Sequence, residues 1–228
     1  ITDYVKFGKN NSIAIKIYNG IENVGVGQDS HSVTDQTQGN WNGIVGKIEL
    51  RSQKSIFTVK TFPDLTTGNM KVLVNDKEYN LKIDNPQPWS EFTPILYTRS
   101  IVYRGDTIPV TFGFRKIEVK GRDIMLNGRP IYVRGTVENC NFPLTGYPPT
   151  DVESWKKIIQ KCKDYGINTM RFHSYCPPEA AFIAADSLGF YLQPEGPSWP
   201  NHGVKLNHGQ HIDQYLTEET KKICDYYG

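Results

Sequence analysis

Residues 166–193 read GINTMRFHSYCPPEAAFIAADSLGFYLQ: a short apolar strand, a polar loop, a helix and a second strand in succession. The same alternation begins at residues 131–135 (IYVRG) and continues to residue 228, so strand–loop–helix units repeat about three times. Strands that alternate with helices in this way are typical of parallel βαβ units. The repeat therefore predicts the first part of a (β/α)₈ barrel.

The helices of this repeat are marked by apolar spacing and by capping residues. The first begins at residue 152 behind Thr150 or Asp151 and ends at Gly166, because short polar residues cap helix starts and glycine closes helix ends. We expect a second helix over about 179–188, closed by Gly189, and a third over 211–227. The predicted inner stripes are Val152, Trp155, Ile158, Ile159, Cys162 and Tyr165 in the first helix and Ile212, Tyr215, Leu216, Ile223 and Tyr226 in the third.

Polar side chains stand where each predicted strand of the repeat ends. Glu138 and Asn139 follow the first strand, Arg171 and His173 end the second, and Glu195 follows the third. In a (β/α)₈ barrel the active site lies at the carboxyl ends of the strands. These five residues are therefore the first candidates for a functional site.

The first 118 residues have a different character, with short apolar runs between turn residues and no helical period. Two hairpins are indicated by the turns at residues 75–77 (NDK) and 104–106 (RGD). Many short strands separated by turns predict β-sandwich material. The expected strands are 12–18, ending at the Asn19-Gly20 turn, and 44–50, 56–60, 70–74, 79–83, 96–103 and 107–114.

Composition excludes several kinds of partner. The 26 basic and 24 acidic residues leave a formal net charge of +2, too balanced to favour nucleic acid or an anionic membrane. No apolar run approaches the ~20 residues that a membrane span requires. The chain begins with Ile1 and shows no signal peptide, and residues 1–5 resemble the inside of a domain, so we expect a processing boundary there.

The cysteines and histidines give little sign of a metal site. Cys140, Cys162, Cys176 and Cys224 show no metal-type spacing. Cys162 is expected as a buried free thiol, and a disulfide between Cys140 and Cys176 stays open. A loose group formed by His202, His208 and His211 lacks partner ligands, so neither metal nor cofactor is predicted.

Several motifs in the same order closely resemble glycoside hydrolase family 2, which includes β-galactosidases, β-glucuronidases and β-mannosidases. The strongest match is to the junction where an immunoglobulin-like domain meets the catalytic barrel. Earlier segments resemble the end of the family's sugar-binding jelly roll (39–44, GNWNGI) and late immunoglobulin-like strands (89–97, WSEFTPILY). The junction motifs are 112–119 (FGFRKIEV), 126–135 (LNGRPIYVRG), 143–146 (PLTG), 166–171 (GINTMR) and 188–191 (LGFY).

The resemblance implies a multidomain β plus α/β organisation. Residues 1–50 would form the end of the jelly roll, 51–118 an immunoglobulin-like β-sandwich, and 119–228 strands one to three of the TIM barrel with the helix after the third. The middle segment is short for a domain of about 100 residues. We therefore expect deleted strands, or residues absent from the sequence near Asn75-Asp76.

The resemblance also implies chemistry. Retaining glycosidases use two carboxyl groups ~5–5.5 Å apart, one as acid/base and one as nucleophile. In the family both are glutamates on barrel strands four and seven, so no residue here takes either role. The parent protein is expected to be a retaining β-glycosidase, and this chain alone to be inactive. A non-catalytic carbohydrate-binding module and a structural fragment remain the alternatives.

Substrate contacts are then expected from the strand ends. Arg171 matches a family arginine that supports the catalytic centre, with a structural ion pair as the alternative. His173 stands near a sugar-binding histidine of the family, although a structural histidine is as common. Glu195 follows Pro194, where the family has an Asp-Glu pair, and could bind a sugar hydroxyl, a metal or Arg171.

The remaining candidates are less specific. Glu138 and Asn139 stand where β-galactosidases carry histidines, which casts doubt on a galactosidase-type subsite. Trp199 could stack on a sugar ring or lie in the core, and Asp35 could reach the barrel or lie on the surface. The implied partner is a carbohydrate, with a homo-oligomer left open. The Cys-Pro-Pro-Glu run resembles enzymes of polysaccharide-degrading gut bacteria, which points to a periplasmic or secreted protein.

Overall fold

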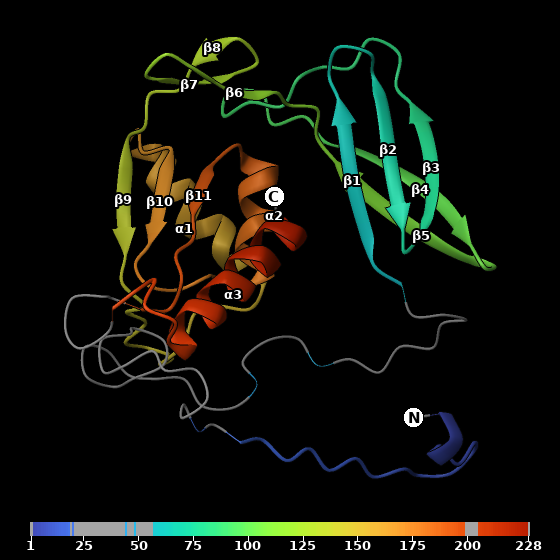
Figure 1. The fold of residues 1–228 in the computed structure, drawn as a ribbon. Helices are drawn as coiled ribbons and strands as arrows, with labels where there is room; N and C mark the ends of the chain where they lie inside the picture. Colours follow the sequence, from blue (N-terminus) through green and yellow to red (C-terminus); the bar gives the residue numbers. More distant parts are fainter. Residues whose placement is uncertain are drawn as a thin grey trace.

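The computed structural model describes residues 2–18, 20, 44, 48, 57–198 and 205–227. Small antiparallel sheets are followed by a parallel β/α segment (Figure 1). The antiparallel strands are β1 (Val59–Asp64), β2 (Asn69–Val74), β3 (Lys77–Lys82), β4 (Tyr97–Tyr103), β5 (Asp106–Phe112), β6 (Ile117–Lys120), β7 (Asp123–Leu126) and β8 (Arg129–Pro130). The parallel segment consists of β9 (Gly135–Glu138), α1 (Val152–Asp164), β10 (Thr169–Phe172), α2 (Glu179–Leu188), β11 (Tyr191–Gln193) and α3 (His211–Tyr227), after a short 3₁₀ helix at Thr2–Tyr4.

Two of the antiparallel sheets share one buried apolar cluster. Strands β1–β3 form one sheet and β4–β5 the other. Side chains of β5 alternate between buried and exposed, as expected for a strand with one face on a core. Both predicted hairpins are confirmed, and Arg104 and Gly105 form the second turn with φ of 50° and 84°. The buried cluster consists of Met70, Val72, Val74, Ile83, Ile101, Tyr103, Ile108, Val110, Phe112 and Phe114.

The region where we expected absent residues is a regular hairpin. Val74 pairs with Lys77, so Asn75 and Asp76 alone connect β2 to β3. Asn75 adopts φ 51°, and its side-chain oxygen accepts a hydrogen bond from the Thr58 N–H at 2.9 Å. The turn therefore closes without any irregularity in strand register.

Two strand predictions near the N-terminal side differ from the structure. Residues 12–18 form no strand, and Ile13 is 68% exposed. Alternating apolar residues form a strand only when another segment pairs with their backbone, and no described segment does so. The strand expected at 56–60 begins instead at Val59, and of the strand expected at 44–50 only Ile44 and Ile48 lie inside the described residues.

The first parallel strand begins later than its apolar run predicted. Residues 131–134 lie between the β6–β8 sheet and β9. Two of their backbone N–H groups donate to acceptors outside β10. The Ile131 N–H donates to the Ile124 carbonyl at 2.8 Å, and the Arg134 N–H donates to Asn168 Oδ1 at 2.8 Å. Pairing with β10 therefore begins at Gly135, and Glu138 is the last residue of the strand rather than a residue beyond it.

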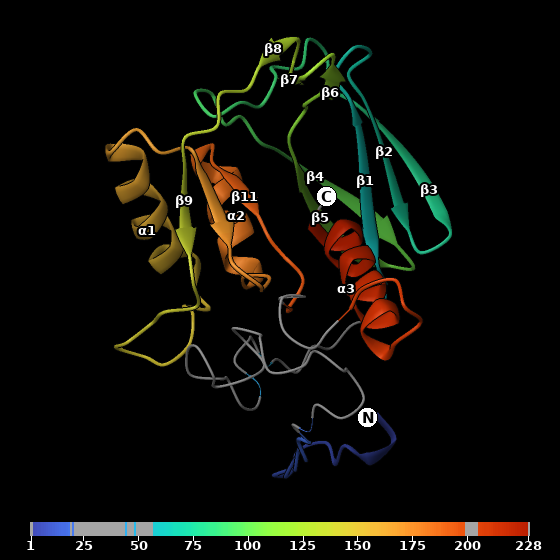
Figure 2. The same cartoon turned by 60° about the vertical axis from the view of Figure 1, so that its left-hand side comes forward.

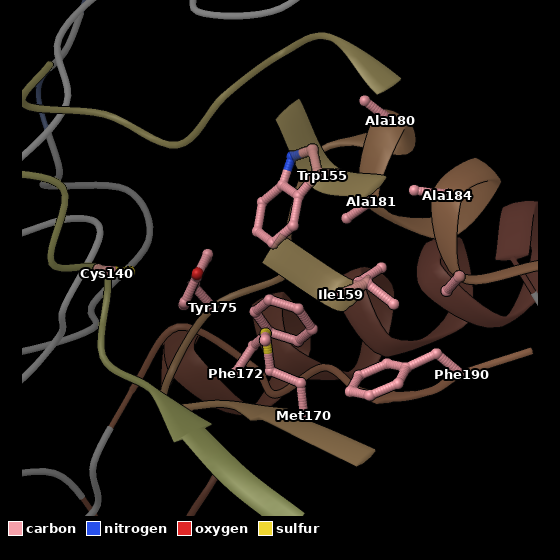
Figure 3. Close-up of a cluster of buried hydrophobic side chains, with 11 residues drawn as sticks. Cys140, Trp155, Ile159, Met170, Phe172, Tyr175, Ala180, Ala181, Ala184 and Phe190 are labelled. Carbon is pink, nitrogen blue, oxygen red and sulfur yellow. The ribbon is translucent and has the colours of Figure 1, made fainter. Parts of the chain in front are cut away.

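The parallel sheet has the order β11-β10-β9 and carries α1 and α2 on one face (Figures 1 and 2). The core between them is aromatic and tightly interlocked, with the Phe172 ring edge-on to both Trp155 and Tyr175 (Figure 3). Small side chains of α2 let the helix approach this core closely. The buried residues are Cys140, Trp155, Ile159, Met170, Phe172, Tyr175, Ala180, Ala181, Ala184, Ala185 and Phe190.

The helix limits agree with the sequence signals. Asp151 caps α1 by accepting a hydrogen bond from the Ser154 N–H at 2.8 Å, and Gly166 follows the helix with φ 75°. Tyr165 and Tyr226, both expected on inner stripes, are exposed. At the end of α3 the neighbouring Tyr227 makes the contact instead, stacking on Phe182 of α2 with ring centroids 3.9 Å apart.

The described helices are all too short or too polar to cross a membrane. The four cysteines are free thiols, so the pairing of Cys140 with Cys176 left open above is not formed. Cys140 is buried and Cys162 is half-buried against the aromatic core.

Candidate functional site

Strand register determines which polar side chains share a face of the parallel sheet. Met170 and Phe172 of β10 point into the core beneath α1 and α2. Arg171 lies between them and therefore points to the opposite face, because successive strand residues alternate. Its register partners are Val137 of β9 and Gln193 of β11, so these three residues form one row.

Arg171, His173 and Glu195 meet at the carboxyl ends of β10 and β11, and we refer to them as the Arg171–His173–Glu195 cluster. The Arg171 Nε donates to Glu195 Oε1 at 2.5 Å, and its Nη2 lies 3.1 Å from His173 Nδ1. The second carboxylate oxygen, Oε2, lies 3.3 Å from His173 Nδ1 and accepts a hydrogen bond from the Ser174 N–H at 2.9 Å. Three side chains from two strand ends are thus joined into one hydrogen-bonded group.

Partial burial strengthens the interactions of this cluster. The exposed fractions of the Arg171, His173 and Glu195 side chains are 37%, 29% and 26%. Burial raises the pKa of Glu195, but hydrogen bonds from Arg171, Ser174 and His173, together with the Arg171 charge, outweigh it and lower the pKa overall. Glu195 is therefore a carboxylate at neutral pH and serves as an acceptor rather than as a proton donor.

Replacing Glu195 by glutamine tests this ion pair. A group whose pKa is lowered by folding adds stability above its unfolded pKa, and this stability is lost as the pH falls through the folded pKa. We expect Glu195→Gln to lower the free energy of unfolding by about 1–2 kcal/mol at neutral pH, with the difference shrinking as the pH falls below the ordinary glutamate pKa of about 4.3. Urea denaturation across this pH range measures it. Glu153→Gln is the control, because Glu153 forms an exposed pair with Lys156, and an equal loss there would contradict the assignment.

Glu138 lies apart from the Arg171–His173–Glu195 cluster. It pairs in register with Phe172, which points into the core, so the Glu138 side chain leaves the sheet on the face opposite Arg171. Its carboxylate accepts hydrogen bonds from the N–H groups of Cys140 and Asn141, each at 3.1 Å. Burial raises its pKa against the lowering effect of these backbone donors. The Glu138 carboxylate is therefore hydrogen-bonded to the backbone of its own loop. Asn139, the next residue, is exposed.

Sequence reasoning missed the residue that completes the cluster. Ser174 is buried, has φ 63°, and supplies both an N–H to Glu195 and an Oγ located 3.3 Å from His173 Nδ1. Cys140 adopts a similar φ of 59° two residues after the end of β9. Positive φ is uncommon for such residues, and no signal in the sequence indicated it.

The other predicted contacts are placed as follows. Trp199, Asp35 and His202 lie outside the described residues, whereas His208 and His211 are exposed. Within the described part of the chain, no three histidine, cysteine or carboxylate side chains gather as metal ligands would.

Comparison with known proteins gives a consistent relationship. The model of a family described as Glycosyl hydrolases family 2 matches residues 8–115, across the boundary expected at residues 50/51 and up to the one expected near residue 118. The beta-galactosidase of Staphylococcus xylosus is 29% identical over 133 residues, which cover 58% of this chain and 13% of that protein. The beta-galactosidase large subunit of Latilactobacillus sakei is 32% identical over 155 residues, covering 65% of this chain and 23% of the subunit.

Solved structures share the fold at lower identity. Beta-glucuronidase 3 of Bacteroides uniformis aligns with a TM-score of 0.55 at 18% identity, covering 76% of this chain and 26% of that one. A family 2 beta-galacturonidase of Eisenbergiella tayi aligns with a TM-score of 0.55 at 19% identity, covering 75% and 37%. The chain thus spans well under half the length of each of these relatives.

Proposed function

This chain belongs to glycoside hydrolase family 2 and is related to its beta-galactosidases and beta-glucuronidases, and on that premise we propose that it is part of a retaining β-glycosidase. The parent enzyme hydrolyses O-glycosidic bonds through a glycosyl-enzyme intermediate that water then releases. The observation that carries the proposal is the Arg171–His173–Glu195 cluster, because it lies at the carboxyl ends of parallel strands, where (β/α)₈ enzymes bind their substrates.

The domain organisation proposed with it is the one expected from the sequence. Residues 1–50 are assigned to the end of a jelly roll, 51–118 to a short immunoglobulin-like β-sandwich, and 119–228 to strands one to three of a TIM barrel. The two packed sheets formed by β1–β5 support the second assignment, and the parallel order of β9–β11 supports the third.

The proposed roles within the site follow from the chemistry of the cluster. Arg171 can hold a neighbouring carboxylate in its charged form, and Glu195 fixes the guanidinium in one orientation. His173 is a substrate-binding residue beside them. Glu195 is not a catalytic acid in this proposal, because its pKa is lowered, whereas a general acid needs a raised one. The two catalytic glutamates belong to strands four and seven of the parent barrel.

The proposal is tested first on the natural reading frame that contains these residues. A strand ending in Asn-Glu soon after the position of Gly228 is expected, and a downstream sequence without any such glutamate would overturn the proposal. The encoded protein is then assayed on nitrophenyl β-galactoside, β-glucuronide and β-mannoside, with NMR of the first-formed sugar to read its anomeric configuration. Retention of the β-configuration is expected, and inversion would contradict the mechanism.

The 228-residue chain itself serves as the matched sample in the same assay. We expect it to show no turnover, because it lacks the two catalytic glutamates assigned to strands four and seven. Binding of the sugars without turnover by the parent protein as well would identify a carbohydrate-binding module instead. Turnover by the isolated chain would show that a catalytic pair lies within it, contrary to the proposal.

A further inference from the structure

Asn168, the residue before β10, is only 4% exposed, and its side-chain amide is fully hydrogen-bonded. The Nδ2 group donates to Glu91 Oε2 at 2.7 Å and to the Tyr132 carbonyl at 2.9 Å. Oδ1 accepts from the Arg134 N–H at 2.8 Å and from Thr169 Oγ1 at 3.0 Å. A primary amide has two donors and two acceptor positions, so all of them are used. The amide therefore joins the start of β10 to the segment before β9.

These partners allow only one orientation of the amide. If the amide were reversed, Nδ2 would face the Arg134 N–H and Oδ1 would face the Glu91 carboxylate, which sets donor against donor and acceptor against acceptor. The Glu91 side chain is 11% exposed, and it also accepts from Arg134 Nη2 at 3.4 Å. A carboxylate from the antiparallel part of the chain thus fixes the direction in which the Asn168 amide points.

The contacts of the amide with residues 132 and 134 reproduce the pairing of a parallel strand. In such a ladder a residue donates to the carbonyl before its partner and accepts from the N–H after it. The Asn168 amide does this on either side of Val133, although it belongs to a side chain. The backbone N–H of Asn168 then donates to the Arg134 carbonyl at 2.9 Å, and regular pairing follows from Gly135. The amide therefore acts as an additional paired residue at the start of β10.

Register decides which side chain of β9 lies beside Arg171. Val137 is its register partner, whereas Glu138 pairs with Phe172 and points to the other face. A slip of one residue would exchange the two faces and bring the Glu138 carboxylate beside Arg171, where it would compete with Glu195 for the guanidinium. Strand β9 has four residues and lies at one edge of the described sheet, so few ladder bonds of its own oppose such a slip.

We propose that Asn168 is a positioning residue whose side-chain amide sets the register in which β9 joins β10, and that it thereby keeps Glu138 away from Arg171. Glu91 supports this role by holding the amide in the required orientation. The inference concerns the pairing of the sheet and does not rest on glycosidase activity. Loss of activity in the parent protein would therefore leave it standing, and loss of the pairing would leave the glycosidase standing.

The wild-type chain tests the key hydrogen bond directly. In the full 228-residue chain labelled with ¹⁵N and ¹³C, we expect a scalar coupling across the hydrogen bond between the Arg134 amide nitrogen and the Asn168 side-chain carbonyl carbon. The Tyr191 N–H donates to the backbone carbonyl of the same asparagine at 2.9 Å and serves as the internal reference. A spectrum that resolves the Tyr191 coupling but not the Arg134 coupling would overturn the inference.

Hydrogen exchange in Asn168→Ala tests the role in register. Loss of the hydrogen bond should make the Arg134 amide exchange about tenfold faster. The His173 N–H donates to the Glu138 carbonyl at the far end of the same pairing and should also exchange faster, whereas the Ile131 N–H, which is bonded to β7, should not change. Acceleration confined to Arg134 would make the amide a local contact without a role in register. Equal acceleration of all three amides would show a general loss of stability, and either result would overturn the proposal.

Asn168→Asp tests the part played by Glu91. An aspartate keeps an acceptor for the Arg134 N–H, but it replaces the Nδ2 donor by an oxygen that faces the Glu91 carboxylate. We expect faster exchange of the Arg134 and His173 amides at neutral pH, and recovery when Glu91→Gln is added, because the glutamine amide donates to the aspartate. A further loss of protection in the double variant would contradict the assigned role of Glu91.

Thr169→Val is the matched control for all of these variants. It removes the other donor to Asn168 Oδ1 and leaves the bond from the Arg134 N–H in place, so the Arg134 and His173 amides should exchange as in the wild type. Acceleration as large as in Asn168→Ala would contradict the proposal. Should the alanine variant not fold, the wild-type coupling and the aspartate variants still decide the outcome.

Discussion

Gly189→Ala should lower the free energy of unfolding by about 3 kcal/mol or more, which combines a left-handed backbone cost of about 1–2 kcal/mol with a steric clash. Gly189 closes α2 with φ 71°. A Cβ at this position would lie 2.6 Å from the Glu91 carbonyl oxygen and 2.9 Å from its carbonyl carbon. These are backbone atoms of a segment that must move to admit even one methyl group.

The displaced segment is anchored on both sides, which makes the movement costly. Lys163 Nζ at the end of α1 donates to the carbonyls of both Glu91 and Gly189, each at 3.0 Å. Asn168 Nδ2, just before β10, donates to Glu91 Oε2 at 2.7 Å. Shifting Glu91 therefore weakens contacts to two elements of the parallel segment at once.

Gly166→Ala is the matched control for this variant. Gly166 also follows a helix with φ 75°, but an added Cβ there meets nothing within 4 Å. We expect it to lose only about 1 kcal/mol, the cost of a left-handed alanine. Urea denaturation of both variants measures the difference, and equal losses would show that the close approach of Glu91 to Gly189 has no energetic consequence.

Trp89→Ala should cost about 3–5 kcal/mol, the range for removing a large buried aromatic side chain. Trp89 is 6% exposed and lies between the antiparallel sheets and the parallel segment. Its Nε1 donates to the Asp186 carbonyl in α2 at 2.8 Å, and its ring meets Tyr191 of β11 edge-on with centroids 6.0 Å apart. The truncation would leave a cavity and an unpaired carbonyl at this contact.

Trp89→Phe separates packing from hydrogen bonding. It keeps an aromatic ring near Tyr191 but cannot donate to Asp186, so we expect a loss of about 1–2 kcal/mol. The backbone contacts of Trp89 remain, since its N–H donates to the Phe114 carbonyl at 2.7 Å. Chemical denaturation gives both values, and a loss in Trp89→Phe as large as in Trp89→Ala would mean that the hydrogen bond, and not the ring, stabilises the contact.

Stability and the candidate site lie at opposite ends of the parallel strands. The Glu91 and Trp89 contacts involve residues before β10 and around the start of β11, whereas the Arg171–His173–Glu195 cluster lies beyond their carboxyl ends. This division is general in (β/α)₈ proteins, in which one end carries stability and the other carries chemistry. Gly189→Ala and Trp89→Ala are therefore expected to act on folding without a direct effect on the Arg171–His173–Glu195 cluster.

Local signals were sufficient for most of the secondary structure. Helix α2 occupies the predicted residues 179–188, and α1 begins at the predicted cap, because caps, glycine closures and apolar periods act within about four residues along the chain. The hairpin turns at Asn75 and Arg104 could also be predicted from the sequence, because turn residues stand there between two apolar runs. In the structure both residues adopt a positive φ, which suits such short turns.

Strand pairing between residues far apart in the sequence could not be predicted from such local signals. The alternation at residues 12–18 has the pattern of a strand, but a strand also needs a neighbour, and no described residue supplies one. Glu138 and Arg171 were both candidates for one site because each stands near a strand end, yet register pairs Glu138 with Phe172 and turns it to the other face. A shift of a single residue in register reverses every side chain of a strand.

The same distinction holds for the candidate site. Residue types and strand ends were enough to nominate Arg171, His173 and Glu195, because polar groups at the ends of parallel strands stand at one edge of the sheet. Glu195 accepts hydrogen bonds from Arg171, 24 residues before it in the chain, and from the Ser174 N–H, 21 residues before it. Only the packed sheet brings these atoms within hydrogen-bonding distance, because pairing between strands, and not local propensity, sets their separation.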